Sequence, residues 1–235
     1  TYLHPDRFTP FIAKFEQHPY TLDSFYYIGQ SCWFFDGKSF RNLTKSIPKT
    51  ADMVLGFDVN QTAHNQLFIS YNQPTWSGDN LKSKLFKSTD GGESWEDITA
   101  SLGILAWRHV VSISTNDTNP NEVYVSLGIT DQSEVHKVYK SDDGGKTWYN
   151  YSVGLPPYET FKIEHLPNNS GVVVATLAGL YYRNRTMEGW IKLKGKIPSI
   201  AVRDFEIDIE NRRLTAATYG NGLWQMKIPR KWLNY

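Results

Sequence analysis

Two eight-residue stretches of the sequence repeat one pattern almost residue for residue. Residues 88–95 read Ser-Thr-Asp-Gly-Gly-Glu-Ser-Trp, and residues 141–148 read Ser-Asp-Asp-Gly-Gly-Lys-Thr-Trp. Each octad follows a short apolar run and precedes another strand-like segment. Two consecutive glycines between strands predict a tight hairpin, because glycine adopts positive φ angles without a Cβ clash. The repeat therefore predicts that the chain contains copies of one hairpin unit.

The other residues of the pattern have a structural role in such a hairpin. The aspartate before the glycines can accept hydrogen bonds from turn amides, and the serine two positions earlier can tie the strand end to the turn. The tryptophan can swing back under the turn and bury about 150–250 Å² of apolar surface there. We therefore expect a structural role, rather than catalysis or metal binding, for ten residues: Ser88, Asp90, Gly91, Gly92, Trp95, Ser141, Asp143, Gly144, Gly145 and Trp148.

Both octads resemble the Asp-box (BNR repeat) of sialidase-like β-propellers, which is also found in xyloglucanases, sortilin-type receptors and many secreted bacterial proteins. The resemblance implies that each octad is a turn on the outer rim of a propeller blade. Residues 218–224 resemble the terminal blade of secreted Asp-box propellers, which often have seven blades. Nearly the whole chain is similar to the C-terminal propeller regions of bacterial surface proteins exported by the type IX route. This similarity implies a secreted or cell-surface location.

The spacing of aromatic residues extends the repeat along the chain. Phe40, Trp95, Trp148 and Trp190 recur at intervals of roughly 40 to 55 residues, which fit one four-stranded antiparallel blade each. No segment longer than a turn has helical periodicity, whereas residues 202–209 alternate cleanly between apolar and polar. We therefore predict an all-β chain in which residues 1–235 form a single Asp-box propeller segment. Its blades are expected at about residues 8–48, 51–100, 104–153, 158–196 and 200–229.

The fifth unit has room for only three strands, which leaves two ways to complete a ring. Either an N-terminal strand closes a five-bladed ring, or the units belong to a larger, seven-bladed ring, since a propeller must not leave its end blades with unpaired edges. We favour the larger ring, whose remaining part would come from the parent polypeptide or from another subunit. The sequence starts at Thr1-Tyr2-Leu3 without Met or a signal peptide, which suggests a processed piece of a longer protein.

Composition argues against several classes of function. The net charge of +1 gives no electrostatic basis for nucleic-acid binding, and no apolar run is long enough for a transmembrane helix. A single cysteine, Cys32, excludes an intramolecular disulfide. The histidines lack metal-binding spacing and no phosphate- or dinucleotide-binding glycine pattern occurs, so we expect neither a metal nor a cofactor.

Six Asn-x-Ser/Thr sites occur in the chain. They would carry glycans only in a eukaryotic secretory route, and such sites also arise without meaning in turns rich in Asn and Thr. The six sites are at Asn42, Asn60, Asn116, Asn150, Asn168 and Asn184.

The sequence contains no convincing catalytic arrangement. The arginines show no spacing that singles out the carboxylate-binding triad of sialidases. A glycosidase needs two carboxylic acids facing each other across a cleft. Glu159, Glu164 and Asp204 are candidates at blade openings, but nothing pairs two of them. For Asp204, the alternative is a surface ion pair with its neighbour Arg203, worth about 0–1 kcal/mol.

Ligand binding is better supported than catalysis. Trp107 and Arg108 stand where a blade begins, and an aromatic ring beside an arginine could stack on a sugar or hold a peptide. The alternative is that Trp107 packs between blades and Arg108 is solvated. The candidate ligand-binding residues are therefore Trp107, Arg108, Arg203 and Asp204.

Taken together, these features predict a non-catalytic, extracellular binding or scaffolding propeller that presents a glycan- or protein-binding face within a larger surface protein. The alternative is a fragment of a glycoside hydrolase, of the xyloglucanase or sialidase kind, whose catalytic acids lie partly outside this chain. Both functions rest on resemblance of fold, which does not by itself determine function.

Overall fold

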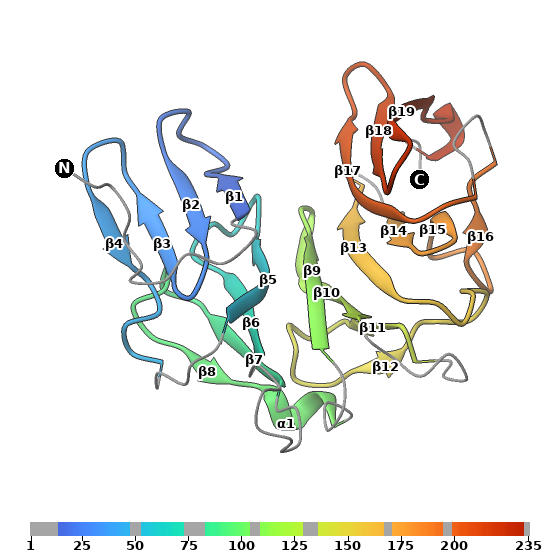
Figure 1. The fold of residues 1–235 in the computed structure, drawn as a ribbon. Helices are drawn as coiled ribbons and strands as arrows, with labels where there is room; N and C mark the ends of the chain where they lie inside the picture. The colour runs from blue at the N-terminus through green and yellow to red at the C-terminus, as the bar shows by residue number, and fades with distance from the viewer. Residues whose placement is uncertain are drawn as a thin grey trace. The chain divides into compact units, whose positions relative to one another are not determined.

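The computed structural model describes residues 14–47, 53–72, 83–103, 109–128, 136–166, 171–194 and 199–232. Within these residues the chain is almost entirely β-structure, with five antiparallel sheets (Figure 1). Two short helices, α1 (Thr99–Leu102) and the 3-10 helix η2 (Arg230–Trp232), are the exceptions among the described residues. The chain divides into two compact units, Thr1–Val110 and Val111–Tyr235.

The first unit contains two four-stranded sheets in which strands adjacent in sequence are paired. Its core lies between the two sheets, where the rings of Tyr26 and Phe57 are 4.9 Å apart. The first sheet consists of β1 (Lys14–Gln17), β2 (Phe25–Ile28), β3 (Cys32–Phe35) and β4 (Phe40–Asn42). The second consists of β5 (Met53–Val59), β6 (Leu67–Asn72), β7 (Ser83–Ser88) and β8 (Glu96–Asp97).

The second unit contains the other three sheets. The third sheet consists of β9 (His109–Asn116, whose first two residues belong to the first unit), β10 (Asn119–Gly128), β11 (Val138–Ser141) and β12 (Tyr149–Asn150). The fourth consists of β13 (Thr160–His165), β14 (Val172–Thr176), β15 (Gly179–Arg183) and β16 (Ile191–Lys192). The fifth consists of β17 (Val202–Asp208), β18 (Arg213–Thr218) and β19 (Gly222–Lys227).

The fourth sheet is covered on both faces, and its sequence reflects this. All five residues of β14, Val-Val-Val-Ala-Thr, are buried, and a continuous run of small and β-branched residues is typical of a strand with no solvent-facing side. One face of the sheet packs in a core cluster with Tyr124 and Tyr151 of the third sheet, and the other with Phe205 and Leu214 of the fifth. Side chains from neighbouring sheets thus form the cores between them.

Short meandering antiparallel sheets of this kind are the blades of a β-propeller. The prediction of an all-β chain with about five blades is confirmed by the five sheets. The last sheet has three strands in the described residues, as the sequence predicts, and β19 lies at its edge. After β19 the chain turns into η2, where the indole of Trp232 stacks on Tyr182 of the fourth sheet with ring centroids 3.9 Å apart.

Candidate functional site

The second octad forms a hairpin turn between β11 and β12, and its polar side chains bond to one another. The hydroxyl of Ser141 donates to Asp143 at 2.8 Å and accepts the N–H of Gly145 at 2.8 Å. The same Asp143 carboxylate accepts the N–H of Thr147 at 2.8 Å and its hydroxyl at 2.6 Å. Gly144 and Gly145 both have positive φ, 71° and 91°, which explains why glycine is needed at both positions.

The first octad has the same geometry between β7 and β8. Ser88 donates to Asp90 at 2.8 Å and accepts the N–H of Gly92 at 2.9 Å. Asp90 in turn accepts the N–H and the hydroxyl of Ser94. Gly91 and Gly92 again have positive φ angles, 72° and 87°.

These hydrogen bonds stabilise the charged form of both aspartates. The hydroxyl of Ser94 is the main cause that lowers the pKa of Asp90 to about 2, and the hydroxyl of Thr147 does the same for Asp143. A carboxylate held by local donors in its ionised form is poorly suited to act as a general acid. The geometry therefore agrees with a structural role for the acids of the octads.

The two octad tryptophans differ from each other. The indole N–H of Trp148 donates to the carbonyl of Gly145 in its own turn at 3.1 Å. That of Trp95 instead donates to the carbonyl of Leu43, after the first sheet, at 2.7 Å. Both side chains are half-buried, and that of Trp95 packs against the core of the first unit.

The fourth sheet has a different turn at the position of the octad, and it contributes a buried ion pair that the sequence did not reveal. There Asn184 accepts the N–H and the hydroxyl of Thr186 in place of an aspartate. Arg185 in this turn bonds to Glu122 of the third sheet, whose side chain is 1% exposed. Lys140, 3.5 Å from the carboxylate, adds a second positive charge.

The Glu122 carboxylate is fully bonded. It accepts the hydroxyl of Tyr124, the guanidinium of Arg185 and the side-chain amide of Asn116. Burial alone would raise the pKa of Glu122, but the hydrogen bonds from Tyr124 and Arg185 outweigh it and lower the pKa. This network holds the third and fourth sheets together within the second unit.

His165 lies beside this network and is buried as a neutral side chain. It is 3% exposed, its ring stacks near Tyr124 with centroids 6.2 Å apart, and neither ring nitrogen has a hydrogen-bond partner. Burial lowers the pKa of His165 to about 4. The imidazole therefore stays uncharged at neutral pH.

Of the four predicted ligand-binding residues, two are placed by the structure. Trp107 and Arg108 lie outside the described residues. Arg203 and Asp204 stand at the start of β17, where the pairing with β18 shifts register between Val202 and Asp204. Such an irregularity re-aims the side chains of a strand and is frequent beside functional sites.

Arg203 is held between two aromatic rings. Its guanidinium carbon lies 4.2 Å from the ring centroid of Phe161 and 5.5 Å from that of Tyr219. Tyr219 is 72% exposed. The start of β13 pairs with the end of β14, and the start of β17 pairs with the end of β18. The exposed Leu177 directly follows β14, so it lies at the same end of the sheets as Phe161, Arg203 and Tyr219. We call Phe161, Leu177, Arg203 and Tyr219 the aromatic–arginine patch.

Asp204 does not form the ion pair with its neighbour Arg203 that the sequence offered as an alternative. Its carboxylate is instead 3.0 Å from the ammonium group of Lys162 on β13, and Glu164 and Glu206 are 3.2 and 3.0 Å from the same group. The third predicted acid, Glu159, is in none of the ion pairs found among the described residues.

Lys162 neutralises much of this acidic cluster. Burial lowers the pKa of Lys162, but the carboxylates of Glu164, Asp204 and Glu206 outweigh burial and raise it above its ordinary value. The ammonium group therefore stays charged between the acids, and it also donates to the carbonyl of Phe205 at 2.7 Å. Within the described residues, no group of three His, Cys, Asp or Glu side chains is placed to hold a metal ion.

Comparison with known proteins identifies the fold. No family profile matches the sequence, and no curated protein matches it. Among solved structures, the chain is similar to the GH74 enzyme of Niastella koreensis, with a TM-score of 0.67 and 13% identity over 91% of this chain and 35% of that one. It is also similar to the Cps50 (Swd1) β-propeller domain of Myceliophteria thermophila, with a TM-score of 0.65 and 12% identity over 95% and 66% of the two chains.

A third similar structure is YCF48 bound to D1 peptide, with a TM-score of 0.57 and 13% identity over 89% of this chain and 66% of that one. The chain thus spans about a third of the GH74 enzyme and about two thirds of the other two structures. No helix among the described residues is long and apolar enough to cross a membrane. At these identities the similarity shows the fold and nothing finer: the chain has the fold of a β-propeller.

Proposed function

We propose that this chain is a non-catalytic propeller segment of a larger, extracytoplasmic protein, in which it presents a glycan- or protein-binding face. The observation that carries the proposal is the position of Arg203 between Phe161 and exposed Tyr219. Aromatic faces stack on sugar rings or apolar side chains, and a guanidinium donates directed hydrogen bonds to hydroxyl, carbonyl or carboxylate oxygens. The patch combines both at one end of two adjacent sheets.

The neighbouring acidic cluster supports binding rather than catalysis. Asp204, Glu164 and Glu206 converge on one lysine instead of facing each other across an open cleft. They offer acceptors to ligand hydroxyl groups while their charge is balanced by Lys162. The similarity to a GH74 enzyme is compatible with a glycan as the ligand, so glycans are the first ligands to test.

The octads fit best as Asp-boxes, and their turn geometry motivates this assignment. With it we propose a secreted or cell-surface location, of the kind found for bacterial proteins exported by the type IX route. We further propose that the remaining part of the parent polypeptide, or another subunit, completes the ring.

The ligand face can be tested by screening the chain on a glycan array and then measuring affinity for the best ligand by calorimetry. Tyr219→Ala and Arg203→Ala should each weaken binding about five- to tenfold, since stacking and cation–π contacts of this kind contribute about 1 kcal/mol. Tyr20→Ala, which removes another exposed tyrosine, is the matched control and should bind as the unchanged protein does. Equal affinity of all three variants would contradict the proposal.

The alternative, a fragment of a glycoside hydrolase, is favoured by one observation: three carboxylates lie together beside the patch. It predicts that the full-length parent protein releases reducing sugar from a polysaccharide. It also predicts that Asp204→Asn or Glu164→Gln abolishes the release without weakening ligand binding. Binding without hydrolysis supports the non-catalytic function.

A further inference from the structure

The last sheet has an open edge. Along β19, the main chain alternates between bonding to β18 and facing away from it. The N–H of Ile228 donates to the carbonyl of Arg212 at 2.8 Å, and the register pairs Met226 with Leu214. By this alternation the even-numbered residues bond to β18, so the N–H and C=O groups of Leu223, Gln225 and Lys227 face outward. No described strand pairs with that side.

The end of the described chain does not cover this edge. Beyond Ile228, which is buried, the backbone leaves the sheet, and Trp232 stacks on Tyr182 of the fourth sheet. This tail therefore packs beside the sheet instead of returning along β19 as a fourth strand.

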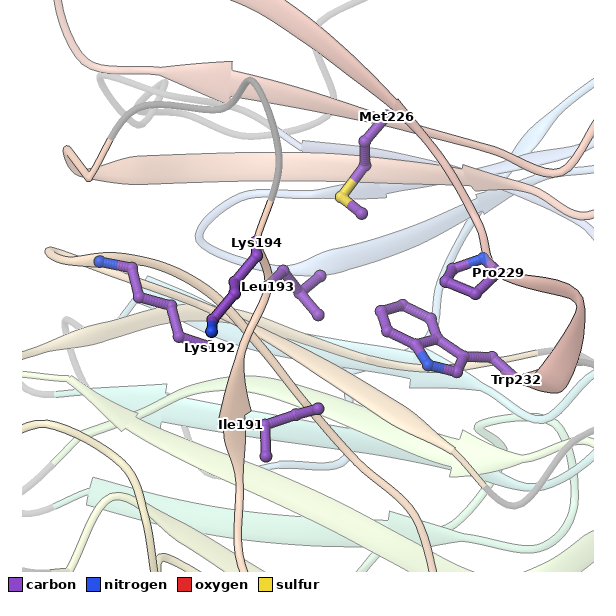
Figure 2. Close-up of a pocket in the computed structure, with 7 residues that line it drawn as sticks. All are labelled: Ile191, Lys192, Leu193, Lys194, Met226, Pro229 and Trp232. Carbon is purple, nitrogen blue, oxygen red and sulfur yellow. The ribbon is translucent and has the colours of Figure 1, made fainter.

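A pocket lies next to the open edge. It has a volume of about 470 Å³, enough for one large side chain and part of a backbone. Figure 2 shows Leu193, Met226 and Trp232 directed toward a common space, with Pro229 on the side of Trp232 (Figure 2). Leu193 and Trp232 are buried, and Ile191, at 49% exposure, lies at the rim. The pocket is therefore apolar, and one wall of it, Met226, belongs to the open strand itself.

The charge around the pocket has one sign. Lys192 and Lys194 line it at the end away from Trp232, and no acidic residue lines it. Lys227 on β19 adds a third positive charge beside the edge. Lys192 is bonded to the hydroxyl of Ser199 at 2.9 Å, and among the described residues neither Lys194 nor Lys227 forms an ion pair with an acid.

We propose that an extended, acidic segment of a partner polypeptide adds a fourth strand to β19 and inserts one bulky apolar side chain into this pocket. The outward main-chain groups supply affinity independent of sequence, whereas the pocket and the three lysines select the segment. Residues 1–13 of this chain contain one aspartate and one arginine, so they do not match the charge of the site. The inference rests on the proposal that a polypeptide segment outside this chain completes the ring. It does not depend on the aromatic–arginine patch.

The test measures binding of fluorescein-labelled peptides to the 235-residue chain by anisotropy. The probe is a nine-residue peptide of alternating Glu and Val with Leu at its centre. The comparison peptides replace every Glu with Lys or with Thr, or the central Leu with Gly. We expect the Glu peptide to bind at least tenfold more tightly than the Lys peptide, at least fivefold more tightly than the Gly peptide, and less tightly as salt is raised.

Gln225→Pro provides the matched variant. Proline removes the outward N–H at this position without removing a bond to β18, and Gln225→Ala loses the same side chain but keeps the N–H. We expect Gln225→Pro to weaken peptide binding at least tenfold and Gln225→Ala to change it less than twofold. In the unchanged protein, the peptide should slow hydrogen exchange at Leu223, Gln225 and Lys227.

Several outcomes would overturn the inference. One is equal binding of the Glu, Lys and Thr peptides. It would show that a strand can add to β19 but that the site does not select an acidic segment, which contradicts the proposed partner. A second is full protection of the three outward amides from hydrogen exchange in the free, dilute protein, which would mean that the chain covers its own edge. A third is protection that appears only as the protein concentration is raised, which would mean that a second copy of the chain pairs with the edge. Glycan binding by Gln225→Pro shows whether the strand-addition proposal and the aromatic–arginine patch fail separately. This variant should bind glycan as the unchanged protein does, because Gln225 is not part of the patch.

Discussion

Arg185 reaches from a turn of the fourth sheet to Glu122, a carboxylate that is 1% exposed in the third sheet. The turn in which it lies stands where two other sheets have a Gly-Gly octad. This turn keeps local hydrogen bonds through Asn184, and Arg185 adds a bond to the neighbouring sheet. Because the carboxylate is buried, the arginine contributes more to stability than its own half-exposed position would suggest.

Removing this arginine should destabilise the fold. Loss of one partner of a buried ion pair leaves a buried charge, and with Tyr124 and Lys140 still present we expect Arg185→Met to cost about 2–3 kcal/mol. Arg213→Met is the matched control, because Arg213 is equally exposed but pairs with Asp208 near the surface, a bond worth about 0–1 kcal/mol. Urea unfolding of both variants measures the difference. An equal loss of unfolding free energy in the two variants would show that Arg185 does not stabilise the buried Glu122 carboxylate.

The buried His165 should make the protein less stable in mild acid. Its pKa is about 4 in the folded protein against 6.5 in an exposed histidine, so the unfolded chain binds a proton between these values and the folded protein does not. The free energy of unfolding should therefore fall by about 3 kcal/mol as pH is lowered from 7 to 4. The variant His165→Phe should be less sensitive to pH in this window. If its stability follows pH as steeply as the unchanged protein does, another group is responsible.

The tryptophans of the repeat should not contribute equally. Trp190 is 4% exposed and donates to the carbonyl of Tyr151 at 2.6 Å, so Trp190→Ala should cost about 3–5 kcal/mol. Trp148 is only half-buried, so Trp148→Ala should cost less, about 1–2 kcal/mol, in proportion to the apolar area lost. Thermal unfolding monitored by circular dichroism compares the two. A larger loss for Trp148 would show that the octad tryptophan has a role beyond the contacts of its turn.

Asn-x-Thr sites in this chain should act as turn elements. The side-chain oxygen of Asn60, which is fully buried, accepts three hydrogen bonds from Thr62 and Ala63. Asn60→Ala should therefore cost about 1–3 kcal/mol, because three donors of the turn lose an acceptor that is itself buried. Asn119→Ala, which loses one long bond of 3.3 Å at an exposed site, should cost less than about 0.5 kcal/mol. Unfolding of Asn60→Ala at the same denaturant concentration as the control would contradict this role.

The architecture could be predicted from the sequence because its signals are local. The Gly-Gly turns, the aromatic spacing and the strand alternation of residues 202–209 depend on residues close together in the chain, and they predicted five sheets and a three-stranded last one. The alternative that Asp204 pairs with its neighbour Arg203 used the same locality, but the structure pairs Asp204 with another residue. Its partner, Lys162, is far away in sequence and reaches it only because β13 and β17 pack side by side.

The rest of the site depends on packing between sheets, which leaves no pattern in the sequence. Nothing near Phe161 or Tyr219 indicates that both rings contact one arginine. Nothing in the sequence near Glu122 indicates that its buried carboxylate bonds to Arg185, in a turn of another sheet. Arg203 itself was named as a candidate from the sequence, but its contacts with the two rings could not be predicted.

The most direct test of the ligand face is hydrogen exchange of the chain with and without the best glycan or protein ligand. The account predicts slower exchange at residues 160–163, 201–205 and 217–219, the ends of the strands that form the aromatic–arginine patch. Exchange in the two octads, residues 88–95 and 141–148, should not change. Protection confined to the octads, or absent from the patch while ligand is bound, would contradict the assignment of the patch as the binding face.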